Sequence, residues 1–465
     1  MKRTQAINLD TRGDVYVQVP SYPEKAKFSQ MKKLLVLSVI ALLTTAFQSH
    51  AAVRVMTLQQ CIDSALVHNR TIRQQELNRA SRELAYDQAR ANLLPNLNAS
   101  AGQSFMFGRS LIADNTYRNV NASQTSFGIG SGITLFDGMR MKYNIDARRA
   151  EMMAANADLK KIQEDIRLNV TVAYLQVLLY KENKQTAISQ LELTTQKLEQ
   201  RAALVAAGKL PEGELFELKA QQAREELNHT RTETQLKLAL LDLAQIIELA
   251  DFENLDVELP LDMVNADAQL ISATEVYQSA LQSRPELKAA EHRLKSSLIN
   301  VDIARAAYLP TLSLGAQMST GYYNLNGVPN NSFGQQTRDN LSTNVGFNLQ
   351  IPVFNRFATR NQVANSKLAV DNSRLEMENT KVQLRKTIEQ AYQNAIAAQS
   401  RLDAARKSEQ ASREAYRYAE QKYEAGRASV YELYSAKANL TQVISELSQS
   451  KYEYLLRIQV LQLLK

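Results

Sequence analysis

The sequence predicts an α+β membrane protein that is internally duplicated, with two very long helices and two β-hairpins. Three observations lead to this prediction: two long stretches without glycine or proline, two pairs of segments in which apolar and small polar residues alternate, and a repetition of the whole pattern along the chain. Each half is therefore expected to contain a helix, a hairpin, a long helix and a returning helix.

The two long helices are predicted from residues 139–207 and 353–425, neither of which contains glycine or proline. Glycine and proline are the strongest interruptions of helices, and here each stretch is closed by a glycine, Gly208 and Gly426. At about 1.5 Å per residue, a helix of this length spans roughly 100 Å.

The first of these stretches carries an apolar stripe whose steps of three and four average about 3.5 residues, as in a coiled coil. The stripe consists of Leu159, Ile162, Ile166, Val170, Ala173, Val177 and Tyr180. A purely structural coiled coil would show the same stripe, so the stripe alone does not indicate a function.

The period changes to two after Pro95, which predicts strands with one apolar face. The alternating apolar residues are Leu97, Ala99, Ala101, Phe105 and Phe107, and after a polar loop Phe127, Ile129, Ile133 and Leu135. Each strand is long enough to cross a membrane when tilted, which takes about ten residues. A two-sided soluble sheet would alternate in the same way.

The small number of strands favours a barrel shared by several chains. Four strands cannot close a barrel, an open edge is not tolerated in lipid, and about eight strands are the practical minimum. The apolar positions would then face lipid and the Gly, Ser and Asn positions the lumen. Aromatic residues that would suit the membrane interfaces are Phe136, Phe354, Tyr308, Tyr322 and Tyr323.

The second half of the chain repeats the first. The sequence Leu-Pro-Thr-Leu at 309–312 matches Leu-Pro-Asn-Leu at 94–97, an offset of 215 residues. From Val345 to Ala438 the offset is constant at 218, and it pairs Ala425-Gly426 with Ala207-Gly208. A constant offset over this length indicates a duplication.

Residues 31–51 are expected to be a secretory signal peptide. Two lysines precede a largely apolar run at 34–43 that is too short to span a bilayer, and Ser49-His50-Ala51 offers a small-residue cleavage site. Because this signal begins at an internal methionine, residues 1–30 are expected to be a start-site artefact. The alternative is a genuine cytoplasmic tail before a membrane anchor.

The remaining chain is expected to divide into two repeats joined by a linker. The expected boundaries are 52–249 for repeat 1 (hairpin 96–136, long helix 139–207, return helix 212–249), 250–270 for the linker, and 271–465 for repeat 2 (hairpin 311–354, long helix 356–425, return helix 430–464).

Composition excludes several classes of function. The formal charge of +7 falls to +3 without residues 1–51, which carry seven basic and three acidic residues, so a nucleic-acid partner is not indicated. Cys61 is the single cysteine, which excludes an intrachain disulfide and is expected to be a buried structural residue. The four histidines have no ligand spacing, and no phosphate loop or nucleophile motif occurs, so no catalytic, metal or cofactor site is expected.

The ordered set of motifs resembles the TolC-like outer-membrane efflux proteins, also called the outer-membrane factor family. The shared features are the Leu-Pro-x-Leu step, the turns Leu-Phe-Asp-Gly at 135–138 and Val-Phe-Asn-Arg at 353–356, and the Ala-Gly tips. The resemblance covers 55–464 and implies a homotrimer. Twelve strands would form an outer-membrane barrel continuous with a helical coiled-coil tunnel in the periplasm.

The resemblance also implies a function and partners. It implies a passive exit channel of a tripartite efflux or type I secretion system, opened by a periplasmic adaptor (a membrane fusion protein) and an inner-membrane pump. The adaptor-docking tips would be Ala207, Gly208, Lys209, Ala425, Gly426 and Arg427. The two glycines would equally serve as ordinary helix C-caps.

The family's tunnel gate falls on a second set of residues: Glu214, Glu217, Tyr423, Arg427 and Glu432. The match is incomplete, because Glu217 corresponds to Ser435 in the second repeat and the family's arginine position is Ala428. Both Glu214 and Glu432 would also suit the first turn of a helix, where acids complement the helix dipole.

Two other functions remain open from the sequence. One is a secreted periplasmic coiled-coil structural or adaptor protein without a barrel. The other keeps the fold but exports polypeptides rather than drugs or metals, since a passive tunnel needs no cargo-specific pocket.

Overall fold

The computed structural model describes residues 54–111, 115–250, 252–258, 270–327 and 329–465, and Val55–Lys465 forms one compact unit. The expected start-site artefact (1–30) and signal peptide (31–51) lie outside the described residues, as does 259–269 of the expected linker.

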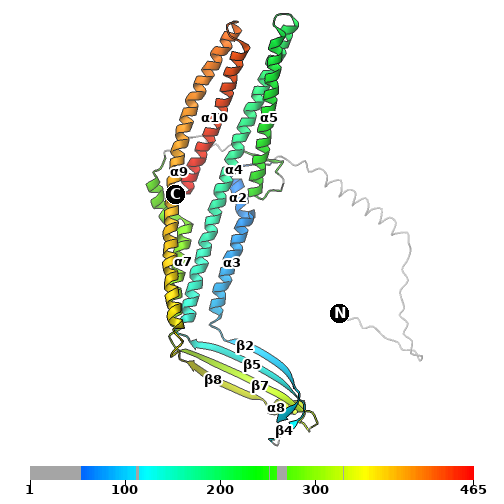
Figure 1. Ribbon diagram of the computed structural model, residues 1–465, viewed down its shortest axis with the longest axis vertical. Coiled ribbons are helices and arrows are strands. Elements are labelled where there is room, and N and C mark those ends of the chain that lie inside the picture. Colours follow the sequence, from blue (N-terminus) through cyan, green and yellow to red (C-terminus); the bar gives the residue numbers. More distant parts are fainter. Residues whose placement is uncertain (1–53, 112–114, 251, 259–269, 328) are drawn as a thin grey trace, which may run out of the picture. The chain divides into compact units, whose positions relative to one another are not determined.

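Helices make up most of this unit, and the two repeats contain them in the same order except for the short α8, which only repeat 2 has in the described chain (Figure 1). Repeat 1 contains α2 (Leu58–His68), α3 (Arg70–Ala91), α4 (Arg140–Ala206) and α5 (Glu212–Ile246). Repeat 2 contains α6 (Ala273–Ser283), α7 (Pro285–Ala306), α8 (Phe333–Asp339), α9 (Ala358–Glu424) and α10 (Val430–Leu463). Both α4 and α9 are 67 residues long. Within the described chain, none of the helices combines the length and the apolar character needed to cross a membrane.

Four long antiparallel strands form one sheet in the order β2-β5-β7-β8. Their bounds are β2 Asn96–Met106, β5 Ala122–Phe136, β7 Thr311–Leu325 and β8 Ser342–Gln350. Two further sheets pair β1 (Arg54–Met56) with β6 (Leu255–Val257) and β3 (Arg109–Leu111) with β4 (Tyr117–Asn119). The hairpin β2–β5 of repeat 1 lies beside the hairpin β7–β8 of repeat 2, which leaves β2 and β8 as the two edges of the four-stranded sheet.

The register gives this sheet one apolar and one polar face, because residues aligned across an antiparallel pair point to the same side. One aligned row on the apolar face is Ala99, Ile129, Met318 and Thr343. The adjacent row on the polar face is Asn98, Gly130, Gln317 and Asn344. The alternation seen in the sequence therefore corresponds to two faces of different chemistry.

Two positions of the alternating pattern, and the end of the second expected hairpin (311–354), differ from expectation. A β-bulge between Thr134 and Phe136 leaves Leu135 out of the ladder, so Phe136 rather than Leu135 pairs with Leu312. Phe107 lies just past the end of β2, and β8 ends before Pro352, which has no N–H to donate to a ladder.

Each long helix begins after a turn in the left-handed region of backbone space. Gly138 has φ 69° and Met139 has φ 68°, while the corresponding Arg356 and Phe357 have φ 53° and 60°. A Cβ at Gly138 would lie 2.8 Å from the Leu309 side chain, so repeat 1 requires glycine there. In repeat 2 the same turn is made by arginine, at a cost in backbone strain.

Where β7 extends beyond β8, side chains rather than a neighbouring strand make hydrogen bonds to its backbone. The ladder between β7 and β8 ends at Ser319. Beyond it, the Gln336 amide donates to the Tyr323 carbonyl and accepts from the Tyr323 N–H, both at 3.0 Å. The Asn330 amide makes the same two contacts with Leu325, at 2.9 and 3.2 Å. The edge of β7 is thereby covered by its own loop, which includes α8.

The largest core cluster lies where α2, α4 and α5 meet the small sheet β1–β6. Tyr174 of α4 is fully buried there, and its hydroxyl contacts the Met56 carbonyl at 3.1 Å and the Glu258 carbonyl. Cys61 is also fully buried in this cluster. Tyr174 therefore ties both short strands to the first long helix.

Replacing Tyr174 with Phe should keep the ring packing and remove the hydroxyl from the buried Met56 carbonyl and the partly buried Glu258 carbonyl. We expect a loss of about 1–3 kcal/mol in the free energy of unfolding, the usual cost of leaving a buried polar group without a partner. Thermal unfolding in detergent would measure it. Tyr392, the half-buried counterpart in repeat 2, provides the control, and equal effects of the two Tyr→Phe changes would contradict this role.

Candidate functional site

The turns that connect α4 to α5 and α9 to α10 have the same backbone geometry. Gly208 and Gly426 both have φ 70°. In the first turn Gly208 N–H donates to Val205 O at 2.9 Å and Lys209 N–H donates to Leu204 O at 2.9 Å. In the second turn the corresponding distances are 2.9 Å (Gly426 to Tyr423) and 2.8 Å (Arg427 to Lys422). This is the helix C-cap in which glycine takes the left-handed position, so the local role of both glycines is established.

These tips are open to the surroundings. All six residues predicted for docking, Ala207, Gly208, Lys209, Ala425, Gly426 and Arg427, are exposed. A Cβ added to Gly208 or Gly426 would meet nothing within 4 Å. Each tip therefore presents a glycine followed by one basic residue on a free surface.

Two of the predicted gate residues contact each other. The Tyr423 hydroxyl of α9 donates to Glu214 Oε2 of α5 at 2.8 Å. The Arg201 guanidinium lies 5.0 Å from the centre of the Tyr423 ring. Burial, together with the bond to Glu214, raises the pKa of Tyr423, so this hydroxyl stays protonated and able to donate. The contact joins the two helical hairpins, α4/α5 and α9/α10, close to their tips.

The other predicted gate residues are not brought together. Glu217, Arg427 and Glu432 are exposed, and within the described chain their side chains make no hydrogen bond or ion pair. Glu432 lies in the first turn of α10, where its backbone N–H donates to the Ser429 hydroxyl at 3.2 Å. Its position therefore agrees with the simpler role of an acid at a helix N-terminus.

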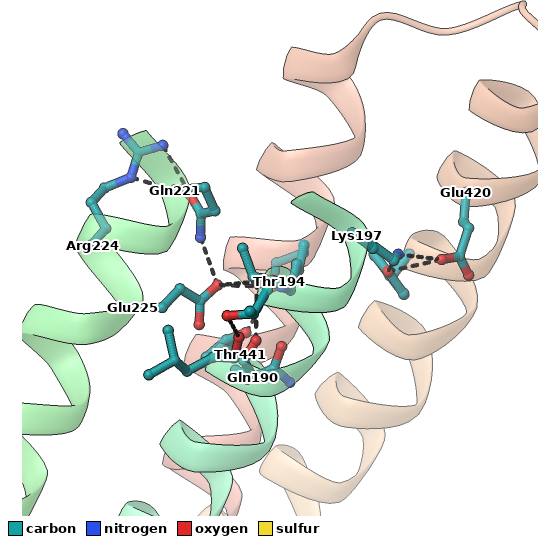
Figure 2. Close-up of polar contacts among 12 residues, drawn as sticks. Gln190, Thr194, Lys197, Gln221, Arg224, Glu225, Glu420 and Thr441 are labelled. Carbon is teal, nitrogen blue, oxygen red and sulfur yellow. Dashed lines mark hydrogen bonds and ion pairs between the residues drawn. The ribbon is translucent and has the colours of Figure 1, made fainter. Parts of the chain in front are cut away.

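A second contact between the hairpins lies farther from the tips than the first and was not predicted from the sequence. Lys197 of α4 donates to Glu420 of α9 at 2.9 Å and to the Tyr416 hydroxyl at 3.2 Å (Figure 2). The hydrogen bond from Lys197 holds the pKa of Glu420 below its ordinary value. Burial alone would lower the pKa of Lys197, but the bonds to Glu420 and Tyr416 outweigh it and raise that pKa.

A third contact is buried and carries a full charge pair. Lys437 of α10 lies 3.2 Å from Glu225 Oε1 of α5 and donates to the Thr194 hydroxyl of α4 at 2.7 Å. The two charged residues are 4% and 7% exposed. Gln221 also donates to Glu225 at 2.8 Å, as Figure 2 shows. Burial lowers the pKa of Lys437, and Glu225 opposes that shift.

A polar hollow lies at the opposite end of the long helices, where they meet the sheet. Its volume is about 1230 Å³. It is lined mainly by the polar face of the sheet, by the turn before α4 and by the first turn of α4, including Asn98, Gln317, Asn344, Asp137 and Arg140. Among the described residues, no group of three or more His, Cys, Asp or Glu side chains could hold a metal ion.

Comparison with known proteins identifies the family. The sequence pattern of the family described as "Outer membrane efflux protein" matches residues 61–247 and 276–464. Protein CyaE of Bordetella pertussis is 25% identical over 320 residues, 68% of this chain and 64% of the relative. The cation efflux system protein CusC of Escherichia coli K12 is 27% identical over 313 residues, 66% of this chain and 63% of CusC. The chain thus aligns with less than two thirds of the length of these relatives.

A solved structure shows the same fold. The open state of the MtrE outer membrane channel of Neisseria gonorrhoeae aligns with a TM-score of 0.71 at 21% identity, covering 88% of each chain. The predicted fold class is confirmed: a duplicated α+β chain whose hairpins and long helices are those of an outer-membrane channel. The predicted location in the outer membrane is confirmed by the same matches. With its family pattern matched in both repeats, the chain belongs to the outer membrane efflux protein family.

Proposed function

We propose that this chain forms the outer-membrane exit channel of a tripartite efflux or type I secretion system. The channel is a passive duct that a periplasmic adaptor and an inner-membrane pump open. The observation that carries this proposal is the open sheet β2-β5-β7-β8, which has one apolar face, one polar face and two edges without a strand beside them in the described chain.

The sheet supports a barrel shared by three chains. Four strands are too few to enclose a lumen, and three chains of four strands each would supply twelve. Edge strand β8 of one copy would pair with edge strand β2 of the next, so that no edge remains in lipid. The row of Asn, Gly and Gln side chains would then face the lumen.

The alternative of a secreted coiled-coil protein is less well supported. The apolar face of the sheet carries large exposed side chains, among them Val345, Phe347 and Leu349, and Phe347 is 71% exposed. A contiguous apolar face of this kind is unfavourable in water and marks a surface that lipid or protein covers. Membership of the outer membrane efflux protein family points to lipid.

The cargo is expected to be chosen by the pump rather than by this chain. CusC is named for cation efflux, and the related OpmQ of Pseudomonas aeruginosa is named for pyoverdine export. Relatives with such different names each align with more than half of this chain, which agrees with a tunnel that has no cargo-specific pocket. Drugs, metals and polypeptides remain candidates.

The helix tips supply the proposed docking surface and gate. The exposed tips at 207–209 and 425–427 would meet the tips of the adaptor. The contact between Tyr423 and Glu214 would help to hold the resting tunnel closed, since it joins α9 to α5. Glu217, Arg427 and Glu432 would act as charged groups at the mouth.

Single-channel recording in planar bilayers tests the proposed function. Detergent-extracted protein should insert and conduct weakly, with brief openings, because the resting tunnel end is closed. Correctly processed protein that is soluble without detergent and does not conduct would refute the duct and favour the coiled-coil adaptor.

The double variant Glu214→Ala/Glu432→Ala should change the conductance or reduce the preference for cations, because it removes two carboxylates per chain from the tunnel mouth. Recordings in a salt gradient would measure both quantities. Glu212→Ala, in the same first turn of α5, is the matched control. Currents identical to wild type in the double variant would exclude these two residues from the gate.

A further inference from the structure

The buried pair Lys437–Glu225 lies at a joint between the two helical hairpins. Lys437 belongs to α10, while its contacts Thr194 and Glu225 belong to α4 and α5. Both charges are almost fully buried, so removal of either one would leave the other without compensation in a medium of low polarity. The pair therefore fixes how the second hairpin sits against the first.

The duplication places a counterpart of this joint elsewhere in the chain. At the constant offset of 218 residues, Lys437 corresponds to Lys219 and Thr194 corresponds to Ser412. Ser412 is buried in the second hairpin, where it accepts from Asn439 at 3.2 Å. Lys219 is exposed on α5. The same lysine–hydroxyl pair is thus present in the sequence, but Lys219 and Ser412 do not contact each other within one chain.

A second copy of the chain would bring Lys219 and Ser412 together. Within a chain, the long helix α4 of repeat 1 packs against the return helix α10 of repeat 2. In a closed ring of copies, the equivalent contact is between α9 of one copy and α5 of the next. Lys219 of the second copy would then approach Ser412, as Lys437 approaches Thr194.

The two kinds of joint differ in one decisive residue. The position of Glu225 in repeat 1 is occupied by Val443 in repeat 2. Val443 is 6% exposed and offers no charge to a lysine. Glu409 lies three residues before Ser412 on α9, and it already accepts from Arg413 at 2.7 Å. Burying the Lys219 ammonium beside a hydroxyl and a valine costs more free energy than its contact with the hydroxyl can offset.

We propose that the charge pair is confined to the joints within each chain, and that the joints between copies, where Lys219 meets Ser412 and Val443, part first when the tunnel opens. This inference rests on the proposed function, because it assumes a ring of copies around a tunnel. It assigns Lys219 to the interface between copies and makes Val443 the residue that keeps that interface weak.

Val443→Glu is the direct test, because it supplies the missing carboxylate at the joint between copies. In planar bilayers it should lower the open fraction about fivefold, the effect of roughly one additional favourable contact. Adding Lys219→Met should abolish this decrease, since the new carboxylate then has no lysine to meet. A decrease that persists without Lys219, or no decrease at all, would overturn the proposal.

A second pair of variants adds no charge to the core and guards against misfolding of Val443→Glu. Lys437→Met leaves Glu225 buried without its cation and should raise the open fraction. Lys219→Met removes an uncompensated lysine and should leave the open fraction unchanged or lower it. Equal increases in the two variants would overturn the distinction between the joints.

The failure of this inference can be told apart from the failure of the proposed function. If wild type conducts but the variants do not differ as described, only this inference is wrong. A wild type that does not conduct refutes the proposed function and this inference with it.

Discussion

An unpaired strand edge inside a lipid bilayer leaves backbone N–H and C=O groups without partners, and each such group costs several kcal/mol. The sheet β2-β5-β7-β8 has two such edges. The rest of the structure follows from this constraint. The hairpins of the two repeats already pair with each other through β5 and β7, and the remaining edges require further copies. Where β7 extends past β8, Asn330 and Gln336 satisfy its backbone from within the chain.

The duplication also determines how the helices are arranged in a ring of copies. Each repeat supplies one helical hairpin with an identical glycine-capped tip, so a ring of copies alternates hairpins of two kinds. The hairpins of one chain are joined at successive levels by Tyr423–Glu214, Lys197–Glu420 and Lys437–Glu225. Each of these contacts uses at least one residue that changes between the repeats, so the two repeats share a backbone arrangement but not the same side-chain contacts. A tunnel built this way has strong and weak joints even though its helices are nearly equivalent.

Much of the fold could be predicted because the sequence patterns that mark its main helices and strands extend over many residues. The absence of glycine and proline marks α4 and α9, and a period of two marks the four long strands. Short elements left no such signal: the strands of β1–β6 and β3–β4 are three residues each. In α8, with seven residues, Phe333 is the one large apolar side chain. The bulge at Leu135 is invisible to an alternating pattern, which continues through it in the sequence.

The candidate site was predictable only where the family resemblance guided it. It placed Tyr423 and Glu214 near the tips, and the structure brings their side chains together. Lys437 could not be predicted as buried, because a lysine on a long helix is normally a solvated residue. Two features of the sequence could have drawn attention to Lys437. A lysine, Lys219, stands at the corresponding position of repeat 1, and the position of Glu225 is occupied by Val443 in repeat 2. Burial of a charge depends on which helices meet, and that information is tertiary.

The central claim is that the open sheet of one chain is one third of a closed barrel. Electron cryomicroscopy of the detergent-extracted protein tests it most directly. The account predicts three copies in a ring, with β8 of each copy paired to β2 of the next and the Asn98 row facing the lumen. A particle in which β2 and β8 remain unpaired, or in which the apolar face of the sheet lines the interior, would contradict it.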